Sequence, residues 1–386
     1  MRDIFVLGCA RTPMGGLQGA LAESSAPELG GVAIRAALNR ADRAAGDPDA
    51  LFMGCVLPAG QGQAPARQAG FLAGLPESLP ATTLNKMCGS GMQAVMMAMD
   101  AIRAGSADLV VAGGMESMSN APYLLPRMRS GARLGHAQAL DHMFLDGLED
   151  AYDKGRLMGT FAEDCAAEFG FGREAQDRYA LASLSRATDA IASGAFAAEI
   201  APVTLTGRRG EIVVDTDEQP GNARPEKIPH LKPAFRKDGT VTAANSSSIS
   251  DGAAALAIGA DGDGALARIL GHASHAQQPG QFPTAPVPAA QKLLERIGWS
   301  AADVDLWEGN EAFAVVPMAF MARMGLDHGI VNVNGGACAL GHPIGASGAR
   351  IIVTLIHALR SRGGRRGVAA ICIGGGEGTA IAVELV

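Results

Sequence analysis

The chain has 386 residues, of which 48% are hydrophobic and 18% are charged, with a formal net charge of −7. This length is enough for a large core and for two or three domains. The acidic balance argues against a nucleic-acid partner, and no stretch of roughly 18 apolar residues is present to span a membrane.

The first apolar run, Ile4 to Leu7, follows Asp3 and is not followed by a small-residue cleavage site. These flanks predict a first β-strand rather than a signal peptide. The six cysteines are scattered, with no Cys-x-x-Cys pair and no histidine at zinc-finger spacing. We therefore expect no disulfide framework and a reducing location, either the cytoplasm or an organelle, in the latter case with the targeting segment already removed.

Further along the chain, short apolar runs rich in β-formers alternate with Ala-rich helical patterns. The runs are residues 4–7, 109–112 and 368–373, and the clearest helical patterns are 93–104 and 349–360. Strands that are apolar on both faces need helices on each side of their sheet. The sequence thus predicts an α/β fold with helical layers around the sheets.

The two ends of the chain resemble one another. In each half, acidic residues lead into an apolar run ending in Gly, a Gly/Ser turn opens a helix, and a strand then ends in glycines. The matching segments are 47–54 with 303–309, 89–91 with 346–348, and 113–114 with 374–376. We interpret this as a duplication with a pseudo-twofold axis and a cleft between the halves. Coincidence in a glycine-rich chain is the alternative.

Between these halves, from Ser119 to about Ser248, the composition shifts toward charge, Pro and Gly. An N-terminal half is therefore predicted over residues 1–118, completed by about 249–264, with a loop domain over 119–248 and a C-terminal half over 265–386. Within the loop domain we expect an amphipathic helix at 173–193, and its basic residues are candidates for phosphate contacts.

Cys88 lies in the segment Asn85-Lys86-Met87-Cys88-Gly89-Ser90-Gly91, directly before an Ala- and Met-rich helical pattern. The glycines allow a tight turn, which places the thiol at a helix N-terminus. Peptide dipoles there favour the thiolate, and free backbone N–H groups are potential oxyanion donors. A buried structural cysteine beside a helix start is the alternative.

Three later segments add chemistry. His342 lies between Gly341 and Pro343 at a loop-to-helix junction, rather than on an apolar helix face. Cys372 ends a strand and precedes Gly374-Gly375-Gly376; a phosphate-binding loop is a weak alternative here, because the spacing fits neither common glycine motif. Glu308-Gly309-Asn310-Glu311-Ala312-Phe313 places an amide and a carboxylate at the end of another strand.

Together these four segments resemble the thiolase family, specifically the acetyl-CoA acetyltransferases. The Cys-Gly-Ser-Gly, Asn-Glu-Ala-Phe, Gly-His-Pro and Cys-x-Gly-Gly-Gly motifs match in order and spacing, and the resemblance extends over essentially the whole chain. Further matching segments are 56–63, 113–119 and 239–245. The resemblance implies a thiolase fold, with two duplicated α/β halves in an αβαβα arrangement plus an inserted loop domain.

The resemblance implies a role for each site residue. Cys88 is expected to attack the thioester substrate and carry the acyl group, with His342 as its base and Cys372 as a second acid/base. The His342 side chain and a water held by Asn310 are expected to stabilise an enolate oxygen. The backbone N–H groups of Cys88 and Gly374 are expected to stabilise the tetrahedral intermediate, which we take as the reason why Gly374 cannot carry a bulky side chain.

The resemblance also implies coenzyme A or acyl-CoA as substrate, with no permanently bound cofactor. No metal ion is expected, because the thioester supplies the activation and hydrogen bonds stabilise the developing charge. Ser247 is expected to contact the pantetheine arm, and Arg224 or Lys227 to lie near the nucleotide phosphates. The expected lining of the tunnel is Met158, Leu231, Phe235, Ala243, Ile249 and Phe313. A homotetramer built as a dimer of dimers, or a homodimer, is implied, with tetramer contacts in the loop after Ser119.

Three other functions compete with an acetyl-CoA acetyltransferase. Condensing enzymes use a second His or an Asn where this chain has Cys372. A non-catalytic lipid-binding relative is expected to lose catalytic residues that are all present here. A thiolase of broader chain length is favoured by Leu157, which stands where short-chain members often have His. Phe282-Pro283-Thr284-Ala285-Pro286 replaces a common Met-Gly-x-Gly-Pro, although some acetoacetyl-CoA thiolases are similar to the present form. A redox switch between Cys88 and Cys372 is a further possibility that thiol titration tests.

Overall fold

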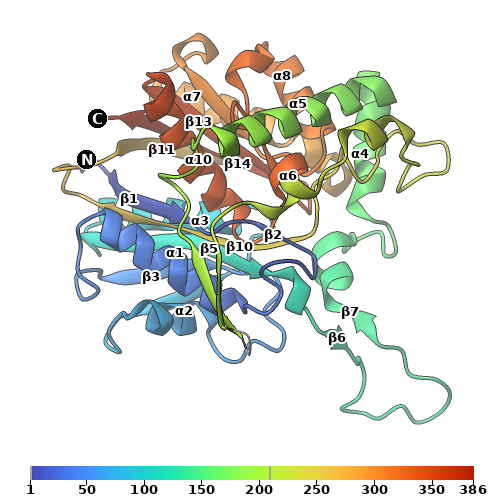
Figure 1. Cartoon of the computed structure of the whole chain (residues 1–386), viewed down its shortest axis with the longest axis horizontal. Coiled ribbons are helices and arrows are strands. Elements are labelled where there is room, and N and C mark those ends of the chain that lie inside the picture. Colours follow the sequence, from blue (N-terminus) through green and yellow to red (C-terminus); the bar gives the residue numbers. More distant parts are fainter. Residues whose placement is uncertain (1, 208–209) are drawn as a thin grey trace.

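The apolar runs of the sequence lie in one ten-stranded sheet of the computed structural model, which describes residues 2–207 and 210–386 (Figure 1). In sheet order the strands are β12 (Leu306–Gly309), β13 (Arg366–Ile373), β14 (Glu377–Leu385), β11 (Ala267–Ala276), β1 (Phe5–Arg11), β10 (Ser250–Gly259), β5 (Leu109–Ser117), β3 (Ala50–Gly54) and β4 (Ala81–Leu84). The short strand β2 (Gly15–Gly16) pairs with β10. The runs predicted at 4–7, 109–112 and 368–373 are thus confirmed as strands, each extending beyond the predicted bounds.

The two halves of this sheet repeat one topology. In the N-terminal half β3 is parallel to β5, and β10 is antiparallel to both β5 and β1. In the C-terminal half β12 is parallel to β13, and β14 is antiparallel to both β13 and β11. Only Phe5 and Val6 of β1 pair across the junction with β11. The repeat supports the duplication that the sequence suggests, with β10 completing the N-terminal half from a distant segment.

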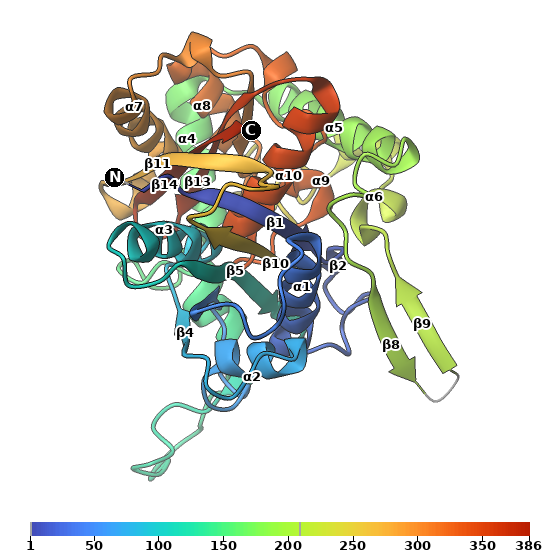
Figure 2. The ribbon, with the colours of Figure 1, turned by 90° about the vertical axis from the view of Figure 1, so that its left-hand side faces the viewer.

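Helices surround each half of the sheet. They are α1 (Ala26–Arg40), α2 (Pro65–Ala73), α3 (Ser90–Arg103), α4 (Met158–Phe169), α5 (Arg173–Ala192), α6 (Glu218–Asn222), α7 (Pro286–Ile297), α8 (Val315–Met324), α9 (Ala337–Leu340) and α10 (Ser347–Arg362). The predicted helices at 93–104, 173–193 and 349–360 correspond to α3, α5 and α10. α1 and α2 cover the outer face of the N-terminal half, and α7 and α8 cover that of the C-terminal half. α3 and α10 lie between the halves and complete five layers (Figures 1 and 2).

The two central helices approach each other closely near their N-terminal ends. A Cβ atom added to Gly91 of α3 would lie 2.8 Å from the backbone nitrogen of Ala349, and one added to Gly348 of α10 would lie 2.5 Å from that of Met92. Glycine at these positions therefore allows a contact between backbones that a side chain would prevent. The loops that precede α3 and α10 are brought together as a result.

The segment predicted as a loop domain, 119–248, encloses residues 208–209, which lie outside the described part. It contains α4, α5, α6, a π-helix (Phe144–Leu148) and a 3₁₀ helix (Pro225–His230). It also has two projecting segments: an arm between β6 (Tyr123–Leu124) and β7 (Leu140–Asp141), and the strands β8 (Val203–Gly207) and β9 (Gly210–Val214) (Figures 1 and 2). Across the two described stretches, no helix has the length and apolar character needed to cross a membrane.

Candidate active site

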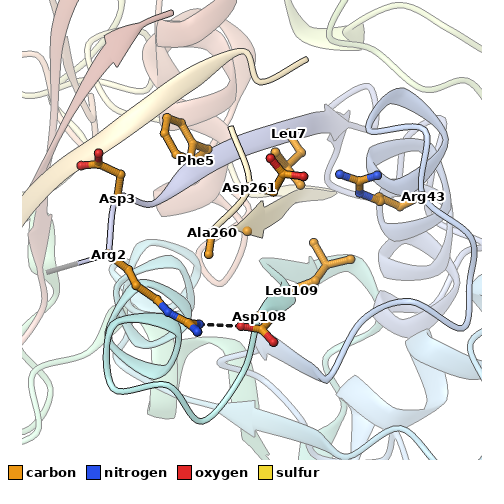
Figure 3. A pocket seen from close by; sticks show the side chains of 10 residues that line it. Arg2, Asp3, Phe5, Leu7, Arg43, Asp108, Leu109, Ala260 and Asp261 are labelled. Carbon is orange, nitrogen blue, oxygen red and sulfur yellow. Dashed lines mark hydrogen bonds and ion pairs between the residues drawn. The ribbon is translucent and has the colours of Figure 1, made fainter. Parts of the chain in front are cut away.

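Two cavities of the structure differ in the side chains that line them. The larger, of about 650 Å³, lies around the start of β1 (Figure 3). Among the described residues its lining has charged and apolar side chains but no thiol, imidazole or hydroxyl, and its Arg2–Asp108 ion pair is largely exposed. The smaller, of about 390 Å³, contains Cys88 and His342. The smaller cavity is therefore the candidate active site.

This cavity lies between the two halves and the loop domain. Its lining is Cys88, Phe144, Gly147, Leu148, Leu157, Met158, Gly159, Ala234, Phe235, Ala243, Ser246, Ser247, Ser248, Ile249, Phe282, Ala312, Phe313, His342, Ile344 and Gly374. Most of these side chains are apolar, and the polar ones gather at few points, as in many small-molecule sites.

Cys88 lies in a strained turn directly before α3. Met87 has φ +47°, in the left-handed region that non-glycine residues seldom adopt. The Ser90 hydroxyl donates to Met87 O at 2.7 Å and accepts from the Lys86 N–H at 2.8 Å, so one side chain holds both ends of the turn. Gly89 lies against the side chain of Ile373, where an added Cβ would lie 2.5 Å from Cδ1. The turn presents the Cys88 thiol to the cavity in a fixed position.

The protonation state of Cys88 differs from the expectation. Burial raises the pKa of its thiol to about 11, although hydrogen bonds from the backbone N–H groups of Gly374 and Cys88 oppose the rise, and the Glu116 carboxylate adds to it. The helix N-terminus alone suggested a favoured thiolate, but desolvation outweighs the local donors. The resting nucleophile is thus a thiol, which needs a base at the moment of attack.

His342 has the properties of that base. Burial, with a smaller effect of the Arg350 charge, lowers the pKa of its imidazole to about 3, so the ring is neutral. Its Nδ1 lies 2.5 Å from Ser347 Oγ, and Ser347 Oγ donates to Pro343 O at 3.0 Å. With the hydroxyl proton committed to Pro343, Nδ1 is the donor to Ser347 and Nε2 carries the lone pair. Nε2 is buried and has no partner within the described residues.

Glu116 joins the two halves beneath these residues. Its buried carboxylate accepts hydrogen bonds from the N–H groups of Val56 at 2.9 Å, Leu57 at 3.1 Å and Gly345 at 2.9 Å. Burial raises the pKa of Glu116 to about 7, against the effect of these donors. Its contacts fix the loop after His342 against the loop after β3.

Cys372 ends β13 in an apolar cluster that includes Phe161, Phe282 and Phe313. It is fully buried and does not itself line the cavity. Burial raises the pKa of its thiol well above the usual value, and the nearby Cys88 adds to the rise. Cys372 therefore holds its proton firmly in the resting site, which suits an acid that protonates a carbanion.

The three glycines after Cys372 differ in their surroundings. A Cβ atom on Gly374 would meet only Met158 Sδ, at an ordinary 3.6 Å, so the protein itself leaves room for a methyl group, and the expectation that Gly374 cannot carry a bulky side chain stays a prediction. The conformational demand lies further on, because Gly375 and Gly376 have φ +96° and +90°. A Cβ on Gly376 would also lie 2.4 Å from Gln277 O.

Asn310 and Glu311 follow β12 and are completely buried. Neither Oδ1 nor Nδ2 of Asn310 has a hydrogen-bond partner in the described part of the chain. The Glu311 carboxylate, by contrast, accepts from Tyr179 at 2.8 Å, Ser183 at 2.7 Å and Asn332 Nδ2 at 2.8 Å. Glu311 thus anchors this loop to α5, while the Asn310 amide stays available for a water or ligand.

Most residues predicted to bind coenzyme A line the cavity: Met158, Phe235, Ala243, Ser247, Ile249 and Phe313. The Ser247 hydroxyl donates to Ala312 O at 3.0 Å, so its oxygen is left as an acceptor. Leu231 and Arg224 do not line it. Leu231 directly follows the 3₁₀ helix and is half-buried, whereas the chain reaches the cavity at Ala234 and Phe235; Arg224 is exposed.

Some residues of the site were not assigned a role from the sequence. Ser347 lies in the segment 346–348 and Glu116 in the segment 113–119, both of which match the family. An isolated Glu near the end of an apolar strand is itself a signal of a buried polar contact. Phe144, Gly147 and Leu148 belong to the π-helix and gave no periodic signal. π-helical turns are often found at functional sites, but they have no simple sequence pattern.

Comparisons with known proteins show the family of the chain. The thiolase N-terminal domain model matches residues 4–261, and the thiolase C-terminal domain model matches residues 264–385. Acetyl-CoA acetyltransferases from Pseudomonas aeruginosa and Escherichia coli are 48% and 49% identical to the chain; the matches cover 99% of both chains for the former, and 100% of this chain and 99% of the relative for the latter.

A crystal structure of the Bacillus anthracis acetyl-CoA acetyltransferase superposes with a TM-score of 0.97 at 39% identity, covering 100% of this chain and 99% of that one. The predicted fold class is thereby confirmed. With both halves matched by family models and full-length relatives at this identity, the chain belongs to the thiolase family.

Proposed function

We propose that this chain is an acetyl-CoA C-acetyltransferase, which condenses two acetyl-CoA molecules to acetoacetyl-CoA and CoA, or catalyses the reverse thiolysis, by a ping-pong mechanism through an acyl-Cys88 intermediate. The similar proteins from P. aeruginosa and E. coli bear this name. The observation that carries the proposal is the meeting of Cys88, His342 and the Gly374 N–H in one apolar cavity, with the Cys372 thiol buried beside it.

In thiolysis the first half-reaction begins with the neutral His342. Its Nε2 takes the proton of the Cys88 thiol as the sulfur attacks the 3-keto carbon. Because the pKa values of both groups disfavour a resting thiolate–imidazolium pair, proton transfer and C–S bond formation proceed together. The C2–C3 bond then breaks, its electron pair forms an enolate, and Cys372 gives its proton to C2. Acetyl-CoA leaves, and the enzyme retains an acetyl thioester on Cys88.

The second half-reaction restores the protons. The Cys372 thiolate takes the proton of incoming CoA, and the CoA sulfur attacks the acetyl carbon. Cys88 leaves as the thiolate and recovers its proton from the His342 imidazolium. Every proton returns to its starting group, and condensation follows the same steps in reverse.

Two sets of donors suit the two oxyanions. The backbone N–H groups of Cys88 and Gly374 lower the pKa of the Cys88 thiol against the effect of burial, so they lie close to where the oxygen of a tetrahedral intermediate would form. The Asn310 amide is buried without a protein partner, which suits the support of a water. Together with protonated His342, such a water would stabilise the enolate oxygen. Preorganised donors of this kind are commonly worth 10²–10³ in rate.

Coenzyme A is proposed as a substrate rather than a resident cofactor, with its pantetheine arm in the cavity beside Ser247 and Phe313. Measured with the purified enzyme, thiolysis of acetoacetyl-CoA at varied CoA should give parallel double-reciprocal lines. Intersecting lines would exclude the acyl-enzyme route, and an absence of turnover would refute the proposed function.

The cavity also favours the broader-chain 3-ketoacyl-CoA thiolase as a second candidate. Leu148, Leu157 and Ile344 line its wall, so the acyl group meets aliphatic side chains. Thiolysis rates across a ladder of 3-ketoacyl-CoA lengths separate the two candidates. A maximum at acetoacetyl-CoA supports the first, and equal or greater kcat/KM at six carbons or more supports the second.

We also propose a homotetramer built as a dimer of dimers, with a homodimer as the alternative. The proposed location is the cytoplasm, and the proposed role is in acyl-CoA metabolism. The arm between β6 and β7 supports the tetramer, because Leu125, Met128 and Leu134 there are 55%, 50% and 98% exposed. Light scattering on the wild type and on Leu134→Ser should show the tetramer for the former and dimers for the latter. A monomeric wild type would contradict both assemblies.

A further inference from the structure

An ion pair links the two loops that carry the thiols. Lys86 lies two residues before Cys88, and its ammonium contacts the Glu377 carboxylate, which lies five residues after Cys372. The side chains are partly buried, with 23% and 37% exposed. The pair therefore connects a loop of the N-terminal half to a loop of the C-terminal half.

Both ends of this pair have rigid supports. Lys86 is held by its N–H bond to Ser90 Oγ at 2.8 Å, and Gly89 N–H donates to Lys86 O at 3.1 Å. Glu377 begins β14, where it pairs in register with Ile373 of β13 and Ala276 of β11. A displacement of either charged residue is therefore a displacement of its whole loop.

The segment between Ile373 and Glu377 consists of three glycines. Two of them adopt positive φ, and glycine restricts the backbone less than any other residue. Gly374, the first of the three, lines the cavity together with Cys88, and its N–H opposes the rise in the pKa of the Cys88 thiol. At one end of this segment Ile373 packs on Gly89, and at the other end Glu377 pairs with Lys86. Two contacts with the Cys88 loop thus bracket the Gly374 donor.

We infer that Lys86 and Glu377 are positioning residues, which hold the Gly374 N–H against Cys88 and thereby complete an oxyanion site whose two donors come from different halves of the chain. Such donors must be held within about 0.5 Å to be effective. The two charges need not touch substrate. They hold the glycine segment at its Glu377 end, where the Gln277 N–H also donates to Gly376 O at 2.8 Å, while Ile373 packs on Gly89 at the other end.

The turnover part of the test rests on the proposed function, and the alkylation part does not. Glu377→Gln keeps the size of the side chain and removes its charge. We expect its kcat for acetoacetyl-CoA thiolysis to fall about tenfold, a fraction of the 10²–10³ lost when an oxyanion donor is removed, while KM stays within about twofold. Lys86→Met should behave alike. The exchanged pair Lys86→Glu with Glu377→Lys should recover most of kcat.

Alkylation of Cys88 by iodoacetamide without substrate separates positioning from a direct effect of charge. Removing the Glu377 charge would by itself favour the thiolate and speed alkylation, whereas a displaced Gly374 donor should slow it. Glu384→Gln is the matched control, since Glu384 lies at the other end of β14 and pairs with Arg268 at 2.9 Å. It should leave the alkylation rate unchanged.

Slower alkylation in Glu377→Gln that is recovered in the exchanged pair supports the inference, even if the enzyme turns over no acyl-CoA. In that case only the proposed function fails. Unchanged or faster alkylation in Glu377→Gln overturns the inference. So does an exchanged pair that is no better than either single charge reversal, provided that urea unfolding shows all variants folded.

Discussion

Replacing Ser347 with alanine tests how His342 is held for proton transfer. Ser347 is 1% exposed at the start of α10, and its hydroxyl lies 2.5 Å from Nδ1 of the imidazole. The substitution leaves Nδ1 without its partner in a buried site, whereas Pro343 O keeps its hydrogen bonds from the backbone N–H groups of residues 346 and 347, at 2.9 and 3.0 Å. The ring then loses both its orientation and the tautomer that leaves Nε2 as the acceptor.

The expected loss in kcat/KM depends on the charge of His342 in the transition state. His342 is neutral at rest and carries the Cys88 proton in the transition state, so the Ser347 contact is then a bond to a charged group. Such bonds are worth about 1.5–3 kcal/mol. Because each 1.36 kcal/mol is a factor of ten, kcat/KM should fall by about 10- to 150-fold, mostly through kcat.

Steady-state thiolysis of acetoacetyl-CoA measures the effect, with Ser361→Ala as the control. Ser361 is on the same helix, and its hydroxyl donates to Ala358 O at 3.1 Å in the same kind of local contact, away from the cavity. The control should retain wild-type kcat. If folded Ser347→Ala kept kcat/KM within twofold of the wild type, the assignment of His342 as the oriented base would be refuted.

Three further changes test separate parts of the site and its surroundings. Cys372→Ser should lose condensation, measured as acetoacetyl-CoA formation, by about 10²–10⁴, because C2 then lacks its base. Transfer of the acetyl group from acetyl-CoA to Cys88 should slow much less, because the CoA thiolate that Cys372 protonates in this step is a stable leaving group; equal losses in both steps would contradict the division of roles. Leu157→Ala should enlarge the cavity and raise kcat/KM for six-carbon relative to four-carbon 3-ketoacyl-CoA by roughly tenfold, and an unchanged ratio would remove Leu157 from the acyl wall. His357 has its pKa lowered from 6.5 to about 4, chiefly by burial, so its contribution to stability is complete above pH 6.5 and is lost as pH falls toward 4. Between pH 7 and pH 4 the wild type should therefore lose about 3 kcal/mol more free energy of unfolding than His357→Gln, and parallel urea titrations of the two would exclude this role.

Local patterns in the sequence predicted most of what depends on neighbouring residues. The apolar runs gave strands, and the repeated segments ending at Gly54 and Gly309 fall on β3 and β12, which hold equivalent places in the two halves. The turn around Cys88 also follows from local chemistry, since glycines and a helical pattern adjoin it. The domain bounds stay predictions. The roles of the site residues also stay predictions, and the variants described above test them.

Features that depend on distant contacts were not visible in the sequence. The helix N-terminus pointed to a thiolate at Cys88, whereas burial between the two halves raises its pKa. The steric need for glycine at Gly376 was not predicted, because the carbonyl that would clash belongs to Gln277, nearly a hundred residues earlier. The role of Glu116 likewise depends on N–H donors from two separate loops. Such effects require the folded arrangement.

Identification of the acylated residue tests the central claim most directly. The enzyme is incubated with acetyl-CoA alone, quenched in acid to preserve thioesters, digested and analysed by peptide mass spectrometry. We predict one acetyl group on the peptide that contains Cys88, its removal on addition of CoA, and no acetylation of that peptide in Cys88→Ser. Acetylation at another residue with full turnover in Cys88→Ser would contradict the account.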